Sequence, residues 1–72
     1  MKQAATKEDT KQRILDEALR LFSQSGYDAV SVERIASAVG IKAPSLYKHF
    51  KSKQEIFDAI VAETYRRYDT FT

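Results

Sequence analysis

The sequence contains four segments in which apolar residues recur every three or four positions, and this spacing constrains the fold more than any other feature. Such a period places the apolar residues on one side of an α-helix, whereas a half-buried strand would alternate apolar and polar residues. Gly26, Gly40 and Ser52 separate the four segments. Because 72 residues enclose only a limited core, we expect one small all-α domain without a large internal cavity.

The first apolar series predicts a helix that begins near Lys7 or Thr10 and ends at Ser25. Residues 1–8 are polar and aperiodic, so they are expected to form a flexible N-terminal arm. Gly26 would end the helix, because glycine adopts the left-handed backbone of a helix C-terminus at little cost. Tyr27 is then expected to fold back onto Phe22, which is the apolar contact that accompanies a Schellman ending.

A second, shorter helix is predicted between Ser31 and Gly40. Ser31 is a good N-cap, and Val30 before it is expected to pack on Ile35 as a hydrophobic staple. Gly40 would end this helix after seven or eight residues. A helix of that length is stable only when it packs on its neighbours.

A third helix is predicted to begin near Lys42 or Ala43, since Pro44 is tolerated in the first helical turn. It is expected to end near Phe50, with Leu46 and Phe50 four positions apart on its buried side. Two short helices joined by a turn with glycine, the second of them basic, are typical of a helix-turn-helix.

The fourth predicted helix begins at Ser52, where "SKQE" has the capping-box spacing between Ser52 and Glu55. Its apolar series runs to the end of the sequence without a stop signal, and its last turns carry aromatic residues that so short a chain cannot easily cover: Tyr65, Tyr68 and Phe71. We therefore expect the natural protein to continue beyond this fragment. The expected fold is a small bundle of three helices with a helix-turn-helix, plus the start of a fourth, linking helix.

Ten apolar residues at helical spacing are expected to form the core: Leu15, Leu19, Phe22, Ile35, Ala36, Val39, Leu46, Phe50, Phe57 and Ile60. A ligand pocket lined by these residues is not expected, because their spacing already accounts for them.

The basic residues are unevenly placed along the chain. From Val39 to Gln54 the sequence has four lysines and no Asp or Glu, although the whole chain has ten acidic residues and a net charge of only +2. A charged run is usually no more than a solvated face, and that interpretation stays open. An acid-free window of sixteen residues favours instead a surface that faces a polyanion.

The composition argues against several classes of function. Without cysteine, and with a single histidine, the chain has no usual zinc site and no nucleophile with a base to activate it. We therefore expect no metal, no cofactor and no enzyme activity. No apolar run approaches the roughly 20 residues that span a bilayer, and "MKQAATKEDTKQ" has no apolar signal region, so a cytoplasmic protein without membrane contact is expected.

The segment "SVERIASAVGIKAPSLYKHFKSKQEIFDAI", residues 31–60, resembles the DNA-binding region of TetR-family transcriptional repressors. It has that family's hydroxyl residue, "IA" pair, small residue before a glycine, "LYxHF" and lysine at the next helix. The upstream "ILDEALRLFSQSGYDAVSV" resembles the family's first helix and following loop. The resemblance implies a TetR-type helix-turn-helix domain at residues 9–52, followed at 53–72 by a helix leading to a C-terminal ligand-binding and dimerisation domain absent from this sequence.

By this resemblance, four residues are expected to contact DNA phosphates: Ser31, Tyr47, His49 and Lys53. Each has an alternative. Ser31 can act as an N-cap alone or in both roles, Tyr47 can be buried in the core, His49 can cap the third helix, and Lys53 can be merely solvated. The start of a helix also favours anions, which supports Lys53 as a phosphate contact.

Base reading is expected from the exposed side of the third helix, with these candidates: Lys42, Ala43, Ser45 and Lys48. Many relatives have Ser or Thr at the position of Lys42 and often glycine at that of Pro44. Lys42 therefore cannot cap the helix as serine would, and is either a new DNA contact or simply exposed. Lys48 and Lys51 are both expected to lie near the duplex. The alternative for each is that it only strengthens the positive field around the protein. Glu33 would repel phosphate or accept from cytosine N4.

The predicted function is sequence-specific binding of double-stranded DNA as part of a transcriptional regulator, in the form of a ligand-responsive repressor. For the parent protein the resemblance implies a homodimer on a palindromic operator, with a small-molecule effector bound only through the absent C-terminal domain. The alternative is a small helical protein-interaction module whose aromatic C-terminal end docks a partner helix.

Overall fold

The computed structural model describes the backbone of residues 7–71 and the side chains of residues 9–65. Within that range the chain forms four helices and no strand: α1 (Lys7–Ser25), α2 (Val32–Val39), α3 (Ala43–Tyr47) and α4 (Lys53–Phe71). The prediction of an all-α fold is confirmed. Since α1 begins at Lys7, residues 7 and 8 of the predicted arm are helical, and residues 1–6 lie outside the described residues.

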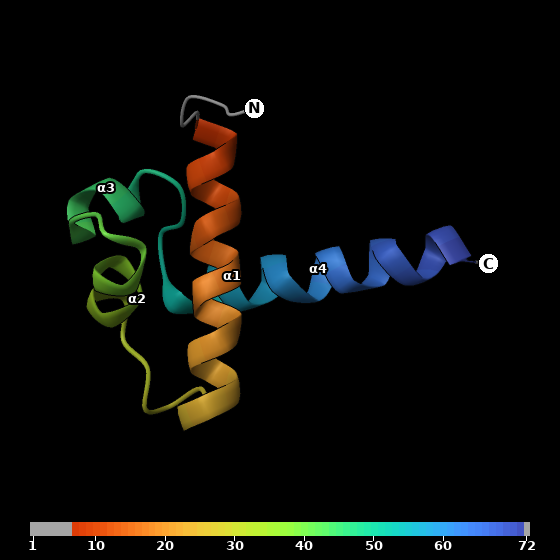
Figure 1. Cartoon of the computed structure of the whole chain (residues 1–72), viewed down its shortest axis with the longest axis horizontal. Coiled ribbons are helices and arrows are strands. Elements are labelled where there is room, and N and C mark those ends of the chain that lie inside the picture. Colours follow the sequence, from red (N-terminus) through yellow and green to blue (C-terminus); the bar gives the residue numbers. More distant parts are fainter. Residues whose placement is uncertain (1–6, 72) are drawn as a thin grey trace.

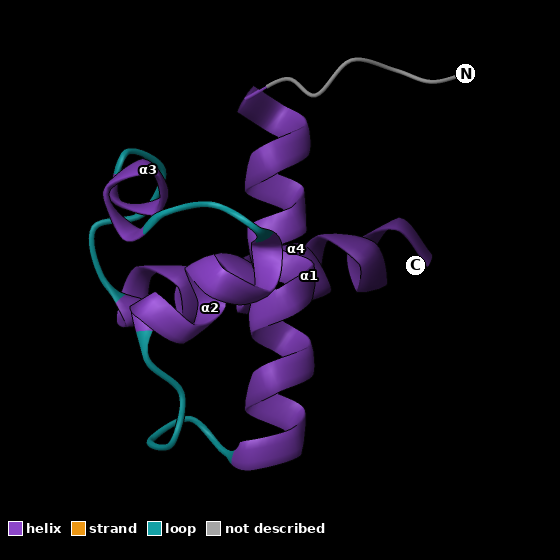
Figure 2. Cartoon of the chain, turned by 60° about the vertical axis from the view of Figure 1, so that its left-hand side comes forward, coloured by secondary structure: helices purple, strands orange, loops and turns teal. Residues whose placement is uncertain are grey.

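Helix α1 lies between the other helices and packs against both α2 and α4. Helix α4 crosses α1, and its C-terminal half projects from the rest of the molecule (Figure 1). Helix α3 packs on α2 and lies on the opposite side of α1 from the C-terminal end of α4 (Figures 1 and 2). In this part of the chain, no helix has the length and apolar character needed to cross a membrane.

The core is one cluster of buried apolar side chains from all four helices and the adjoining loops. Its members are Ile14, Leu15, Ala18, Leu21, Val30, Val32, Ile35, Ala36, Val39, Leu46, Phe50, Ile56 and Ile60. Most of the predicted core residues are among them, and Phe22 packs partly buried against the cluster. The buried positions of Val30 and Ile35 agree with the predicted staple before α2.

The prediction that Leu19 and Phe57 belong to the core is wrong. Their side chains are 51% and 39% exposed. In each helix the preceding residue, Ala18 or Ile56, is fully buried instead, and one residue turns an α-helix by about 100°. The buried side of each helix is therefore rotated away from the predicted one.

Both glycines end a helix, as predicted, and both have the left-handed conformation that was predicted for Gly26, with φ of 87° at Gly26 and 93° at Gly40. The Gly26 N–H donates to the Phe22 carbonyl at 2.9 Å, which is the bond of an αL motif, so the predicted Schellman ending is wrong. The predicted contact between Tyr27 and Phe22 is confirmed, with ring centroids 5.3 Å apart. At Gly40 the following Ile41 N–H reaches back to the Ala36 carbonyl at 3.0 Å, the bond that defines a Schellman motif. The turn between α2 and α3 is thus fixed by hydrogen bonds to the backbone of α2.

Side-chain caps begin α2 and α4. The Ser31 hydroxyl accepts from the Arg34 N–H at 3.0 Å, so the predicted N-cap is confirmed. The Ser52 hydroxyl accepts from the Glu55 N–H at 3.2 Å, which is the first half of the predicted capping box. The second half of the box differs from the prediction. The Glu55 carboxylate accepts from the N–H of Lys51 at 2.9 Å, one residue before the Ser52 N–H that a capping box would use.

The C-terminal end of α2 is held by α1. The Arg13 guanidinium donates to the Val39 carbonyl at 2.7 Å. That carbonyl is among the last four of α2, which have no partner inside the helix, and a cation there also interacts favourably with the helix dipole. Arg13 therefore fixes α1 relative to the turn that leads to α3.

We predict that Gly40→Ala destabilises the fold by about 1–2 kcal/mol, the cost of a left-handed conformation for a residue with a Cβ. An added Cβ would meet no atom within 4 Å, so the loss comes from the backbone and not from a clash. Urea unfolding followed by circular dichroism measures the change. Gly40→Asn should lose less stability than Gly40→Ala, because asparagine tolerates the left-handed conformation better than alanine does. Equal losses in the two variants would contradict the argument.

Candidate nucleic-acid interface

Helix α3 is the element around which the predicted DNA-contacting residues gather. It has five residues and ends at Tyr47, so its predicted end near Phe50 is wrong. A tighter turn follows, in which the His49 N–H donates to the Leu46 carbonyl three residues earlier. The turn still brings both predicted apolar residues into the core, with Leu46 fully buried and Phe50 only 4% exposed.

The side of α3 opposite the core is exposed. Pro44 and Lys48 lie two positions on either side of the buried Leu46 and point away from it, because two residues turn a helix by about 200°. Exposed neighbours extend this surface on both sides. It is referred to below as the α3 face and consists of Lys42, Pro44, Ser45, Tyr47 and Lys48. The α3 face contains all the predicted base-reading candidates except Ala43, which is half-buried.

The polar side chains of the α3 face have no partner among the described residues. The Ser45 and Tyr47 hydroxyls and the Lys42 and Lys48 ammonium groups make no hydrogen bond or ion pair there. Tyr47 is 43% exposed, so the alternative of a tyrosine buried in the core is wrong. Lys42 occupies the N-cap position of α3 without a side-chain cap, as predicted.

Two further predicted phosphate contacts flank the α3 face. Ser31 is exposed at the start of α2, and its hydroxyl accepts a backbone hydrogen bond while its own O–H proton remains available to donate. His49 is half-buried after α3, and its ring makes no hydrogen bond with the side chains and backbone that the structure describes. The alternative role for His49 as a cap of the third helix is therefore not observed in that part of the chain.

The fourth predicted phosphate contact, Lys53, is not merely solvated. Its Nζ donates to the Tyr27 carbonyl at 2.8 Å and lies 4.1 Å from the centroid of the Tyr27 ring. An ammonium group has three N–H donors, so the carbonyl leaves two of them for other acceptors. The first residue of α4 is thereby connected to the loop between α1 and α2.

Two cations near the predicted contacts are not among the predicted residues. The Lys11 ammonium of α1 lies 5.8 Å from the centroid of the Phe50 ring, directly after α3. Arg34 lies in the first turn of α2, after Ser31, and within residues 9–65 its guanidinium has only long contacts of 3.5 Å, to the Ala29 carbonyl and to a serine hydroxyl. Both residues lie outside the acid-free window, and no periodic signal connects Lys11 to a residue so distant in sequence.

Most of the acidic side chains near the predicted DNA contacts accept a hydrogen bond. The Glu55 carboxylate is bonded to the Lys51 N–H, and the Asp58 carboxylate accepts from the Gln54 amide at 3.0 Å. Glu33 is exposed on α2, and its carboxylate has no partner within residues 9–65. Across the same residues no group of three or more His, Asp or Glu side chains could hold a metal ion.

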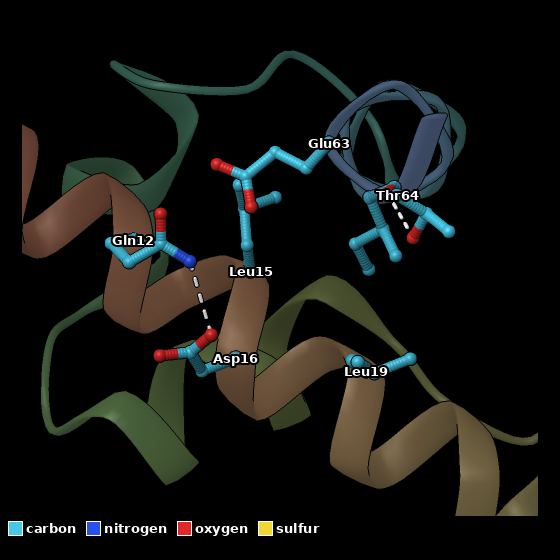
Figure 3. Close-up of a pocket in the computed structure, with 7 residues that line it drawn as sticks. Gln12, Leu15, Asp16, Leu19, Glu63 and Thr64 are labelled. Atoms are coloured by element: carbon cyan, nitrogen blue, oxygen red, sulfur yellow. Dashed lines mark hydrogen bonds between the residues drawn. The ribbon is translucent and has the colours of Figure 1, made fainter. Parts of the chain in front are cut away.

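A separate hollow of about 80 Å³ lies between α1 and α4 (Figure 3). It is lined by Gln12, Leu15, Asp16, Leu19, Ile60, Glu63 and Thr64. Two of its polar groups are bonded within their own helices: the Gln12 amide donates to Asp16 at 3.1 Å and the Thr64 hydroxyl to the Ile60 carbonyl at 3.0 Å. Small-molecule sites usually measure about 300–1,000 Å³, so this hollow is too small for a typical effector.

Comparison with known proteins identifies the family. The model of the family described as bacterial regulatory proteins, tetR family, matches residues 14–60, which is more than half of the chain. The chain belongs to the tetR family. The resemblance found in the sequence is thereby confirmed, and the match includes α2, α3 and the turn between them.

Curated relatives agree with this assignment. The chain is 47% identical over 53 residues to the HTH-type transcriptional regulator AcrR of Shigella flexneri, covering 74% of this chain and 25% of that protein. It is also 47% identical over 51 residues to IcaR of Staphylococcus aureus (strain Newman), named an HTH-type negative transcriptional regulator of the biofilm operon icaADBC, covering 71% of this chain and 27% of that protein. The chain thus spans about a quarter of the length of these tetR-family relatives.

We predict that Ser31→Ala lowers the free energy of unfolding by about 1 kcal/mol, because the Arg34 N–H loses its acceptor. Ser31→Asp should keep most of the stability, since aspartate is an equally good N-cap and its charge suits a helix N-terminus. Thermal and urea unfolding of the two variants measure the difference. If Ser31→Asp is destabilised as strongly as Ser31→Ala, the N-cap role is contradicted.

Proposed function

We propose that this chain is the DNA-binding domain of a tetR-family transcriptional regulator and that the α3 face enters the major groove. One observation carries the proposal. Exposed lysines and hydroxyls of the α3 face have no partner in the described part of the chain, and no acid occurs from Val39 to Gln54. A duplex carries one phosphate charge per about 1.7 Å of its axis, so such a surface matches its charge and its hydrogen-bond acceptors.

The proposed contacts fall into two groups. Backbone contacts come from Ser31, Tyr47, His49 and Lys53. Their hydroxyl, imidazole and ammonium groups can donate to phosphate oxygens, and such contacts set the position of the protein without reading sequence. Base reading comes from Lys42, Ala43, Ser45 and Lys48, with lysine directed to guanine O6 and N7. The exposure of Pro44 on the α3 face adds an apolar group that can meet a thymine methyl.

The proposal extends to the larger regulator. Residues 53–72 begin the helix that leads to a C-terminal domain, which provides the homodimer and binds the small-molecule effector. The homodimer binds a palindromic operator whose half-sites are about one helical turn apart. The regulator works in the cytoplasm, and it represses transcription, as the name of the relative IcaR states for that protein. Neither enzyme activity nor a cofactor is part of the proposed function.

A protein-interaction module is the second candidate, and one observation favours it. Leu19, Val61 and Tyr65 expose apolar side chains on α1 and α4, with Tyr65 67% exposed. Tyr68 and Phe71, which the sequence also pointed to, lie outside the residues whose side chains are described. Under this alternative, polar substitutions at Leu19 and Tyr65 would abolish function, whereas the DNA-binding proposal expects duplex affinity to be unchanged.

We predict that the folded chain binds mixed-sequence duplex DNA of about 20 base pairs, with an affinity that falls linearly on a log–log plot against salt. Lys48→Gln should weaken binding at low salt about five- to tenfold, because a groove contact is lost. Arg20→Gln is the matched control: it removes the same charge from α1, where Arg20 pairs with Glu17 at 2.7 Å. Fluorescence anisotropy measures both.

The control variant should bind within about twofold of the unsubstituted chain, since an exposed charge far from the duplex contributes little. Two results would count against the proposal. One is the absence of duplex binding by the folded chain at about 50 mM salt and high micromolar concentration. The other is an equal effect of Lys48→Gln and Arg20→Gln, which would indicate only a general dependence on net charge.

A further inference from the structure

Tyr27 and Lys53 are far apart in sequence, and they meet through two contacts on one ammonium group. The Lys53 Nζ donates to the Tyr27 backbone carbonyl at 2.8 Å. The same Nζ lies 4.1 Å from the centroid of the Tyr27 ring, well within the distance of a cation–π interaction. A single residue of the loop between α1 and α2 therefore holds the ammonium through both its main chain and its side chain.

The ring that holds Lys53 also contacts three other side chains. Its centroid lies 5.3 Å from that of Phe22 on α1 and 5.5 Å from that of Phe57 on α4. Its hydroxyl donates to the Gln54 side chain at 3.1 Å. The Tyr27 ring thus contacts aromatic side chains of both α1 and α4.

Fixing a lysine has a consequence for binding. Lysine loses more rotamer freedom than most side chains when it is ordered. When the ordering has already occurred in the free protein, it no longer opposes association, and affinity rises. An ammonium group that donates one N–H to a carbonyl also has two further N–H groups that can donate to other acceptors.

We propose that Tyr27 is a positioning residue that holds the Lys53 ammonium in place for a DNA phosphate. This inference rests on the proposed function, in which Lys53 is a phosphate contact. The Tyr27 carbonyl takes one N–H of Lys53, the ring faces the ammonium, and a remaining N–H donates to the phosphate. Helical side chains lean toward the helix N-terminus, so the ammonium adds its charge at the end of α4 that already favours anions.

Two variants of Tyr27 separate the ring from the hydroxyl. Tyr27→Phe keeps the ring and the backbone carbonyl but loses the bond to Gln54. Tyr27→Leu keeps apolar bulk but removes the ring. Phe57→Leu is the matched control, because it removes a ring from the same aromatic cluster and leaves the ring beneath Lys53 in place. Circular dichroism and thermal unfolding confirm that each variant is folded.

The first measurement is made without DNA. The Lys53 methylene protons nearest the ammonium should show an upfield NMR shift from the Tyr27 ring current. Tyr27→Phe should retain the shift and Tyr27→Leu should lose it. Because a ring-current shift depends on the distance and orientation of the ring, this signal reports directly whether the Lys53 side chain lies over the Tyr27 ring in solution.

The second measurement is anisotropy with a random-sequence duplex of about 20 base pairs over a series of salt concentrations. Lys53→Met should reduce the log–log salt slope by about 0.9, the value for one phosphate contact. Tyr27→Leu should weaken binding about three- to tenfold, whereas Tyr27→Phe and Phe57→Leu should stay within about twofold of the unsubstituted chain. In the Lys53→Met background, Tyr27→Leu should cause no further loss.

The outcomes distinguish this inference from the function on which it rests. If the unsubstituted chain binds no duplex, the proposed function fails and the positioning role fails with it. If the chain binds and Tyr27→Leu binds equally well or more tightly, only the positioning role is overturned, because the contact then serves stability alone or competes with phosphate. Equal losses in Tyr27→Leu and Phe57→Leu, or an additional loss in the Lys53→Met background, would overturn it as well.

Discussion

The insertion of Leu46 and Phe50 into the core fixes the position of α3, and every group on the α3 face depends on it. A helix of five residues is far below the roughly 12–15 residues at which an isolated helix becomes even marginally stable. Its helical conformation therefore comes from packing. Because Leu46 is fully buried, Pro44 and Lys48 are held pointing outward. The packing of α3 on the core thus holds the polar side chains of the α3 face in a defined arrangement.

The remaining elements act as supports for that arrangement. Arg13 connects α1 to the last carbonyls of α2, and the Schellman motif at Gly40 sets the direction in which the chain leaves α2. At the other end of the site, Lys53 connects the start of α4 to the loop before α2. Long-range hydrogen bonds to backbone carbonyls therefore hold the residue that ends α2, before α3 in the sequence, and the residue that begins α4, after it. These carbonyls are at chain reversals, where the backbone has no helical partner of its own.

Local signals in the sequence predicted much of this structure. Glycine in the left-handed conformation and the caps at Ser31 and Ser52 depend on a few neighbouring residues, so the helix ends at Ser25 and Val39 could be read directly. The early end of α3 could not, because no glycine or cap in the sequence marks the tight turn after Tyr47, and the spacing of Leu46 and Phe50 is that of a continuing helix. The apolar spacing also did not define which side of α1 and α4 is buried, because it does not indicate which neighbouring helix covers each side.

The candidate site shows the same division. The "LYKHF" pattern and the acid-free window identified the residues of the α3 face, because they are close in sequence and α3 gathers them on one surface. Contacts between distant segments carried no such signal. The Lys11 ammonium above Phe50 and the Lys53 ammonium above Tyr27 each require the tertiary fold. Residues that position or reinforce a site are for this reason harder to predict than those that form it.

The molecule exposes two different sets of side chains: the polar α3 face, and apolar side chains on α1 and α4 that include Leu19, Val61 and Tyr65 and are called the apolar surface below. Titration of an isotope-labelled chain with duplex DNA, followed by amide NMR shifts, tests most directly which of them meets the duplex. We expect shifts to concentrate at residue 31 and residues 42–53, and the amide signals of Leu19, Val61 and Tyr65 to stay unchanged. Shifts confined to the apolar surface would contradict this expectation.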